Sequence, residues 1–149
     1  MVTSTAQPAA RDLPDEADIV FYDGGCGLCH RWVKRLLRYD PDGSKFVYAP
    51  LAGETFARAV PEETRAELPD SIIVQTPGGG LLMKSDAVLH LMRRMGGVWR
   101  LLSAVGRCVP RGLRDFGYDR VAAVRHRVFR KPSEACPLVP ADLRERFRT

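Results

Sequence analysis

The sequence has no apolar run that approaches the length of about 18 residues needed to cross a membrane. It also lacks the apolar stretch of a secretory signal near its start, because residues 1–17 are small, polar and interrupted by prolines. We therefore predict a disordered tail over residues 1–17, a single domain over residues 18–149, and a cytoplasmic location.

Cysteine is scarce, with four in 149 residues. In a cytoplasmic protein these cysteines are not expected to form a structural disulfide framework, so a C-x-x-C motif favours redox or metal chemistry. The hydrophobic fraction of 45% excludes a disordered chain and is enough for one globular core.

Aromatic residues make up only 8% of the chain, and few of them stand among the arginines of the C-terminal part. Positive charge gathers there: residues 91–149 hold 14 Lys/Arg and 5 Asp/Glu, against 9 and 13 in residues 1–90. Such asymmetry can mark a surface that binds nucleic acid or an anionic membrane, but the aromatic platform used for single strands is missing. We interpret the arginines as solvated helix faces and do not expect nucleic acid as a partner.

The chain is organised around residues 19–30, IVFYDGGCGLCH. A short apolar run rich in strand-forming residues comes first, and Gly24 and Gly25 give the backbone the freedom that a sharp turn needs. Apolar residues then recur at helical spacing, with basic residues on the opposite face. The apolar positions are Cys29, Trp32, Val33, Leu36 and Leu37. Cys26 is therefore expected near a helix N-terminus, where unpaired backbone N–H groups favour negative charge.

This placement has a chemical consequence for the two cysteines. A helix N-terminus lowers the pKa of a thiol, and the thiolate is the reactive form. Cys29 lies one helical turn after Cys26, close enough to form a disulfide and to exchange it with another disulfide. We expect Cys26, nearer to solvent, to be the nucleophile and Cys29 to be the resolving thiol. The chemistry needs no organic cofactor and no metal.

Residues 22–29, YDGGCGLC, resemble the D-x-x-C-x-x-C signature of the DCC-type thiol-disulfide oxidoreductases. Further blocks similar to that family follow in the family's order, at residues 70–74, 84–88, 109–111, 118–125 and 136–137. The resemblance covers residues 18–147. It implies a thioredoxin-like fold and a redox-active Cys26–Cys29 pair. The substrates of that family are poorly defined, and we expect a protein or low-molecular-weight thiol or disulfide as substrate, with an external electron donor that the sequence does not specify.

The remaining patterns predict an α/β fold, a thioredoxin-like β-α-β…β-β-α core with additional C-terminal helices over about residues 98–149. Pro41-Asp42-Gly43 is a turn signal before the second strand, and Gly96-Gly97 ends the last core helix. The predicted strands are residues 19–22, 45–49, 71–76 and 81–84, and the predicted helices follow Cys26 and cover 86–95, 98–108 and 113–129, with one or two short helical pieces between 50 and 68 and a last short helix from Pro140. We expect the added helices to pack on the core.

Several residues near the cysteines have two open interpretations. Asp23 either accepts a proton from Cys29 as a general base, or bonds backbone N–H groups in the turn that follows it. Gly27 and Leu28 are candidate substrate-binding residues. Thioredoxins place a cis-proline just before the third strand. By the strand limits predicted here Asp70 holds that place and Pro69 stands one residue earlier, whereas a shift of the strand by one residue would give the place to Pro69. Asp70 and Ser71 are therefore further candidates for substrate binding.

Some residues of the added helices also have open roles. Phe116, Val121, Val124 and Val128 are candidate apolar positions, and Cys108 is expected in the core. Cys136 either packs under the added helices or approaches the active pair. Arg125 either braces these helices, which we favour, or binds an acidic partner.

Three other functions compete with thiol-disulfide exchange. Cys26 and Cys29 can be buried structural thiols in a redox-silent binding module that uses the basic helices. A zinc site would need further ligands, and only Cys108, Cys136, His90 and His126 remain. The string CGLCH also matches the attachment pattern of c-type haem, but no export signal accompanies it. We predict no metal site.

Overall fold

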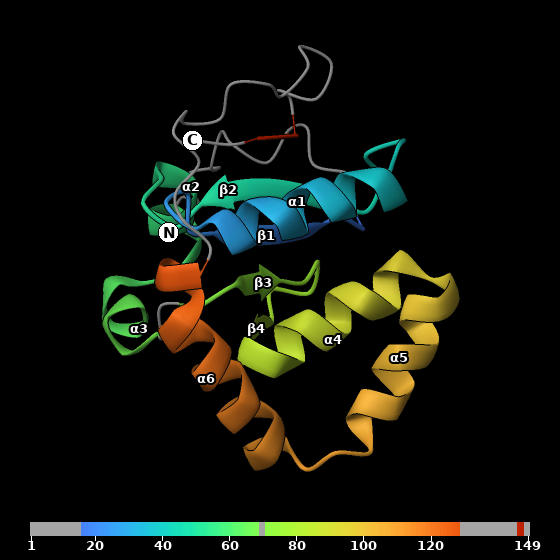
Figure 1. The fold of residues 1–149 in the computed structure, drawn as a ribbon. Helices are drawn as coiled ribbons and strands as arrows, with labels where there is room; N and C mark the ends of the chain where they lie inside the picture. The colour runs from blue at the N-terminus through green and yellow to red at the C-terminus, as the bar shows by residue number, and fades with distance from the viewer. Residues whose placement is uncertain (1–15, 69–70, 129–145, 148–149) are drawn as a thin grey trace, which may run out of the picture.

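The computed structural model describes residues 16–68, 71–128 and 146–147. Its elements follow the order expected from the sequence (Figure 1). They are β1 (Asp18–Tyr22), α1 (Gly27–Tyr39), β2 (Phe46–Pro50), α2 (Glu54–Ala59), α3 (Glu62–Glu67), β3 (Ile73–Gln75), β4 (Leu81–Met83), α4 (Lys84–Met95), α5 (Gly97–Arg107) and α6 (Arg111–Val128).

The four strands form one mixed sheet in the order β2-β1-β3-β4. β1 pairs in parallel with β2 and antiparallel with β3, and β3 pairs antiparallel with β4. A parallel pair needs a crossover connection, which α1 supplies. The predicted thioredoxin-like α/β fold is confirmed, although β3 begins two residues later than expected, at Ile73.

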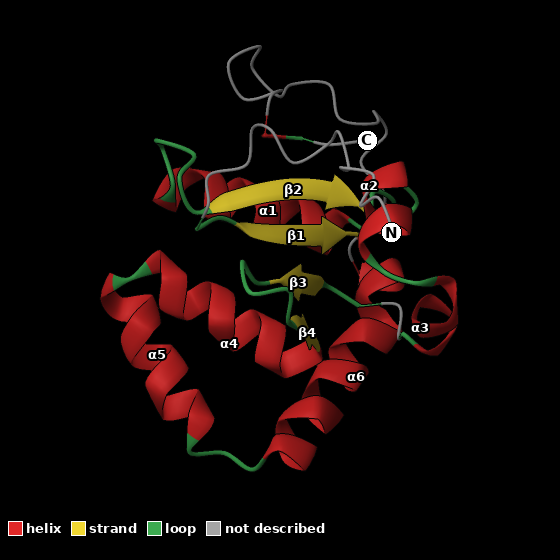
Figure 2. Cartoon of the chain, turned by 180° about the vertical axis from the view of Figure 1, so that it is seen from behind, coloured by secondary structure: helices red, strands yellow, loops and turns green. Residues whose placement is uncertain are grey.

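Side chains that alternate along β1 fill two hydrophobic cores, one on each face of the sheet. Val20 and Tyr22 join the core that includes α1 and α4, whereas Phe21 packs edge-on against Phe56 of α2, with ring centroids 4.9 Å apart. Figure 2 shows β1 between β2 and β3, in the middle of the sheet. The cysteine motif therefore follows directly from a buried central strand.

The pattern predicted for α1 is confirmed, because Cys29, Val33 and Leu36 are buried while the basic residues of the helix face outward or are half-buried. Burial of such an apolar stripe accounts for most of the stability of a helix in a folded protein. It also fixes the rotation of α1, and with it the direction in which Cys29 points.

The connection from α1 to β2 is held by Asp40. Its buried carboxylate accepts hydrogen bonds of 3.1 Å from the backbone N–H groups of residues 44–46. The guanidinium of Arg146 donates to the carbonyl oxygen of Asp40 at 2.7 Å. The ring of Phe147 stacks on Tyr48, with centroids 5.1 Å apart, so residues 146–147 lie against β2.

α5 packs on α4 through its smallest residues. Ser103 is buried and donates to the carbonyl oxygen of Leu89 at 2.8 Å. A Cβ atom at Gly106 would lie 2.7 Å from a methyl carbon of Leu89, so a larger residue there would require the Leu89 side chain to shift. Trp99 adds an edge-on contact with Trp32 of α1, at 6.4 Å between ring centroids.

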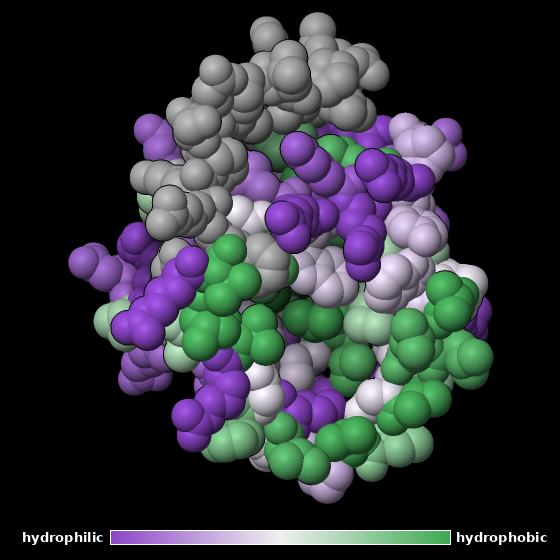
Figure 3. All heavy atoms as spheres, in the orientation of Figure 1, coloured by the Kyte–Doolittle hydropathy of each residue, from purple (hydrophilic) through white to green (hydrophobic). Residues whose placement is uncertain are grey.

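The apolar positions predicted for α6 lie at the surface and not against the core. Phe116, Val121, Val124 and Val128 are between 46% and 66% exposed. The physical reason is that α6 turns polar side chains toward α4, where Asp115 accepts a hydrogen bond from the hydroxyl of Ser85. Apolar side chains consequently gather on the surface over α5 and α6 (Figure 3).

Cys108 was expected in the core, and this prediction is also wrong. The residue is exposed at the C-terminal end of α5, where the chain leaves the helix before Pro110. The buried side of α5 is the one that carries its small residues, and Cys108, at the end of the helix, does not reach the core.

Several predictions concern residues outside the described ranges. These are the tail up to residue 15, Pro69 and Asp70, Cys136, and the short helix expected from Pro140. The division into a tail and one domain therefore stays a prediction. Within residues 16–68, 71–128 and 146–147, no helix is both long enough and apolar enough to cross a bilayer.

Candidate active site

The turn after β1 places Cys26 at the start of α1. A carboxylate oxygen of Asp23 accepts the N–H of Gly25 at 2.8 Å, and the carbonyl oxygen of Asp23 accepts the N–H of Cys26 at 3.1 Å. Cys26 is the N-cap residue of α1 in an extended conformation. The predicted position at a helix N-terminus and the predicted bonding of Asp23 within the turn are thus confirmed.

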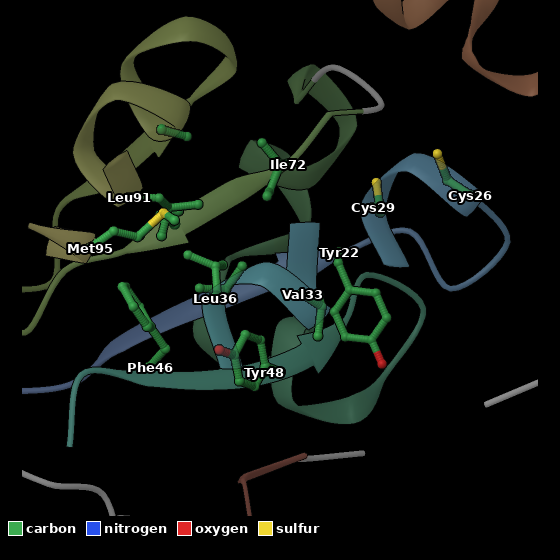
Figure 4. Close-up of a cluster of buried hydrophobic side chains, with 13 residues drawn as sticks. Tyr22, Cys26, Cys29, Val33, Leu36, Phe46, Tyr48, Ile72, Leu91 and Met95 are labelled. Atoms are coloured by element: carbon green, nitrogen blue, oxygen red, sulfur yellow. The ribbon is translucent and has the colours of Figure 1, made fainter. Parts of the chain in front are cut away.

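Cys29 lies one turn further along α1, and both cysteines are free thiols. Their sulfur atoms project from the same end of the helix toward the same side (Figure 4). The prediction that Cys26 lies nearer to solvent is wrong, because Cys26 is 0% exposed and Cys29 is 6% exposed. The reason is that Cys26, like Cys29, belongs to the core formed with Tyr22.

The two thiols lie in an environment that keeps Cys29 protonated. Burial, then the negative charge on Cys26, raises the pKa of Cys29 from its ordinary value of 9.0 to about 12. A backbone hydrogen bond from Asp23 and the positive charge of Arg125 act in the opposite direction, and a hydrogen bond between the two cysteine side chains adds to the increase. At neutral pH Cys29 therefore remains a thiol.

Arg125 reaches the cysteine motif from α6. It is 3% exposed, and its guanidinium lies 3.8 Å from the carboxylate of Asp23. The sequence left two roles open for Arg125, bracing the added helices or binding an acidic partner. Bracing the helices is only part of what the side chain does here. The side chain connects α6 to the turn that carries Cys26.

Tyr118, also on α6, was not recognised as a site residue in the sequence. Its hydroxyl oxygen accepts the backbone N–H of Ile72 at 3.1 Å, and burial raises its pKa above the usual value. Ser71, a predicted substrate-binding residue, is buried and hydrogen-bonds to Tyr118. The signal available in the sequence was the family-like block at residues 118–125, which contains both Tyr118 and Arg125.

A hollow opens beside Cys29, and we call it the Cys29 hollow. Its walls are mainly apolar and come from α1, α4, α6 and the segment before β3; they include Leu28, Trp32, Val88, Val121 and Arg125. Leu28 lies on the wall of this hollow, whereas Gly27 opens α1 and is absent from the lining. The substrate-binding roles of Gly27, Leu28 and Ser71 stay predictions.

The residues considered as metal ligands are dispersed where the structure describes them. His90 pairs with the buried carboxylate of Asp18 at 3.0 Å, and Cys108 is exposed at the end of α5. No group of three or more His, Cys, Asp or Glu side chains in the described ranges is placed to hold a metal ion.

Comparison with known proteins agrees with this arrangement. The uncharacterized Bacillus subtilis (strain 168) protein YuxK is 29% identical over 129 residues, which cover 87% of this chain and 92% of YuxK. The Arabidopsis thaliana protein named DCC family protein At1g52590, chloroplastic, is 29% identical over 124 residues, covering 83% of this chain and 71% of that protein. No solved structure matches. The sequence model of the DCC1-like thiol-disulfide oxidoreductases matches residues 20–131, and the chain belongs to that family.

Proposed function

We propose that this protein is a protein-disulfide oxidoreductase in which Cys26 is the nucleophile and Cys29 the resolving thiol. The observation that carries the proposal is the placement of the two thiols, one turn apart at the start of α1. Cys29, whose pKa is raised to about 12, keeps its proton at neutral pH, while Cys26 stands at the N-terminus of α1. A helix N-terminus favours a thiolate.

The exchange proceeds in two balanced steps. The Cys26 thiolate attacks one sulfur of a substrate disulfide; the substrate S–S bond breaks, its second sulfur leaves as a thiolate, and a mixed disulfide forms. The sulfur of Cys29, after losing its proton, attacks Cys26. This step closes the Cys26–Cys29 disulfide and releases the first substrate sulfur as a thiolate. The substrate gains two electrons and the cysteine pair loses two, and the reverse steps oxidise a dithiol.

Asp23 is the proposed acceptor of the Cys29 proton. Its backbone N–H already bonds to the Cys29 sulfur, and its carboxylate is 26% exposed beside Arg125. A carboxylate so placed can pass the proton to solvent during the second step. This role adds to the structural bond that Asp23 accepts from Gly25.

Substrate approaches through the Cys29 hollow in this proposal. Leu28 on its wall and the preceding Gly27 are proposed to contact the substrate chain, together with Ser71 and Asp70 before β3. Cys26 has no exposed surface, so attack requires the docked substrate to displace its neighbours. The partner is a protein or low-molecular-weight disulfide, and a separate donor restores the dithiol. A cytoplasmic location remains a prediction from the sequence.

Differential alkylation tests the assignment of the pair. The protein is oxidised in a glutathione buffer, alkylated, reduced with dithiothreitol and alkylated again with a heavier reagent, and the labels are located by peptide mass. We expect a reversible two-electron change confined to Cys26 and Cys29. The reduction potential obtained from the same titration gives the favoured direction of electron flow.

A Cys29→Ser variant provides the second measurement. It should accumulate a mixed disulfide through Cys26, because the resolving thiol is missing. Cys108→Ser is the matched control, since Cys108 is an exposed thiol at the C-terminal end of α5. A mixed disulfide that forms through Cys108, or labelling of Cys26 and Cys29 that does not change with redox state, would indicate a redox-silent binding module instead.

A further inference from the structure

α5 presents its apolar stripe to solvent. Val98, Leu101, Leu102 and Val105 recur at helical spacing and are between 46% and 64% exposed. The opposite arrangement is usual, because amphipathic helices on globular proteins bury their apolar stripe. Here the buried side of α5 is the one that carries Ser103 against α4.

α6 continues this exposed surface with positive charge inside it. Leu113, Phe116, Val124 and Val128 share one side of the helix and are between 46% and 66% exposed. Arg120 and Arg127 fall on the same side at helical spacing, and both are exposed. The guanidinium of Arg120 lies 4.8 Å from the ring centroid of Phe116.

Figure 3 shows apolar side chains over α5, over the turn that follows it and over α6, on one face of the molecule. We call this the α5–α6 surface. Many large apolar side chains exposed on one face of a monomer are typical of an interaction site. The surface therefore needs a partner whose chemistry matches it.

The composition of residues 97–128 narrows the choice of partner. This stretch contains seven arginines and two aspartates, and it has no lysine, glutamate, asparagine, glutamine or threonine. Both aspartates form ion pairs, Asp115 with Arg111 and Asp119 with Lys84. The surface thus offers aliphatic groups and positive charge, with almost no neutral side chain for directional hydrogen bonds.

We infer that the α5–α6 surface binds the face of an anionic lipid bilayer. An amphipathic helix of this composition lies in the interface with its apolar side among the acyl chains. Arginines beside that apolar side attract acidic headgroups. The protein would bind peripherally.

Two other occupants fit less well. A second copy of the chain would place like surfaces together, because a two-fold interface is self-complementary. That arrangement would bring Arg120 and Arg127 near their own copies with no acidic residue of the surface to offset them. A protein partner would normally contribute directional hydrogen bonds, for which the stretch 97–128 has few neutral side chains.

Vesicle sedimentation tests the inference with the full-length protein. Vesicles contain either equal parts of phosphatidylglycerol and phosphatidylcholine or phosphatidylcholine alone. We expect binding to the anionic vesicles, weakening with added salt, and little binding to the neutral ones. The variant R120Q/R127Q should bind the anionic vesicles at least about tenfold more weakly than the parent protein. L101E/V105E should lose binding, because charge replaces the inserted side chains.

The control variant A52E/A57E adds the same two negative charges at exposed positions on and before α2. It should bind the vesicles as the parent protein does, and circular dichroism should show unchanged folding for all variants. Absence of parent binding at low salt overturns the inference, as does equal loss in A52E/A57E. So does a concentration-dependent dimer that L101E/V105E dissociates, or binding to an acidic polypeptide without binding to vesicles. Because vesicle binding is measured without disulfide substrate, its failure leaves the proposed exchange chemistry untouched.

Discussion

The hydroxyl oxygen of Tyr118, on α6, accepts a 3.1 Å hydrogen bond from the backbone N–H of Ile72, 46 residues away and just before β3. Because burial raises the pKa of Tyr118, the hydroxyl stays protonated and has a proton of its own to donate. One side chain therefore links the added helix to the segment that borders the Cys29 hollow. This link makes α6 part of the site.

Replacing Tyr118 with phenylalanine should destabilise the fold. Ile72 is 5% exposed, so its N–H would lose its acceptor without gaining water. A buried donor left without a partner costs about 1–3 kcal/mol, which denaturant titration would measure. Tyr39→Phe is the matched control, because Tyr39 is 40% exposed. Loss of its hydroxyl group should change the unfolding free energy by about 0.5 kcal/mol at most. Equal unfolding midpoints for the two variants would contradict this role for Tyr118.

Replacing Arg125 with methionine should slow the resolving step. The positive charge of Arg125 opposes the increase in the pKa of Cys29, so its removal makes the Cys29 thiolate harder to form. Because one pKa unit is a tenfold change in the thiolate fraction, we expect the rate of release to fall by up to about tenfold. The measurement is single-turnover release of substrate thiol from the mixed disulfide at neutral pH. Arg125→Lys should restore part of the rate, because it keeps the charge.

The control for Arg125 is Arg127→Met on the exposed side of α6. This variant removes the same charge two residues away and should release the substrate thiol at the parent rate. If both variants slow release equally, the effect belongs to the net charge of α6 rather than to the contact with Asp23.

The order of elements and the position of the cysteine pair were readable from the sequence, because each rests on local pattern. The apolar run before Gly24 and the helical stripe after Cys26 have the periods of a buried strand and an amphipathic helix. These signals need only a few neighbouring residues. They correctly placed Cys26 at the N-terminus of α1 and Asp23 in the turn.

The added helices were harder to interpret because periodicity gives an apolar side without saying what covers it. The sequence gives Phe116 and Val124 as apolar positions of the helix, yet both are exposed. α6 docks instead through Tyr118, Arg125 and Asp115. Burial of Cys26 was missed for a related reason, since it depends on packing in the core and not on position in the helix. Such tertiary contacts have no local pattern.

Replacing Asp40 with alanine should destabilise the connection between α1 and β2. The carboxylate is 1% exposed and accepts three backbone N–H groups, all of which would lose their acceptor. We expect a loss of about 2–4 kcal/mol in the free energy of unfolding. Asp42→Ala, at an exposed position two residues on, should have little effect. A similar loss in both variants would mean that local charge, rather than these hydrogen bonds, determines the stability of the turn.

The high pKa of Cys29 should make the reduced fold lose stability in alkaline solution. The folded protein keeps the Cys29 proton up to a pKa of about 12, whereas the unfolded chain releases it near the ordinary value of 9.0. The contribution is therefore complete below pH 9 and falls as the pH rises from 9 to about 12, by up to about 1.4 kcal/mol per pH unit.

Denaturant titration under reducing conditions should show that this dependence is smaller in Cys29→Ala than in the parent. Tyr118, whose pKa is raised mainly by burial, contributes to both proteins, and in the parent the negative charge of Cys29 adds to that increase. Cys108→Ala, which removes an exposed thiol, should keep the dependence of the parent, and a Cys29→Ala curve parallel to the parent curve would show that burial does not hold this proton.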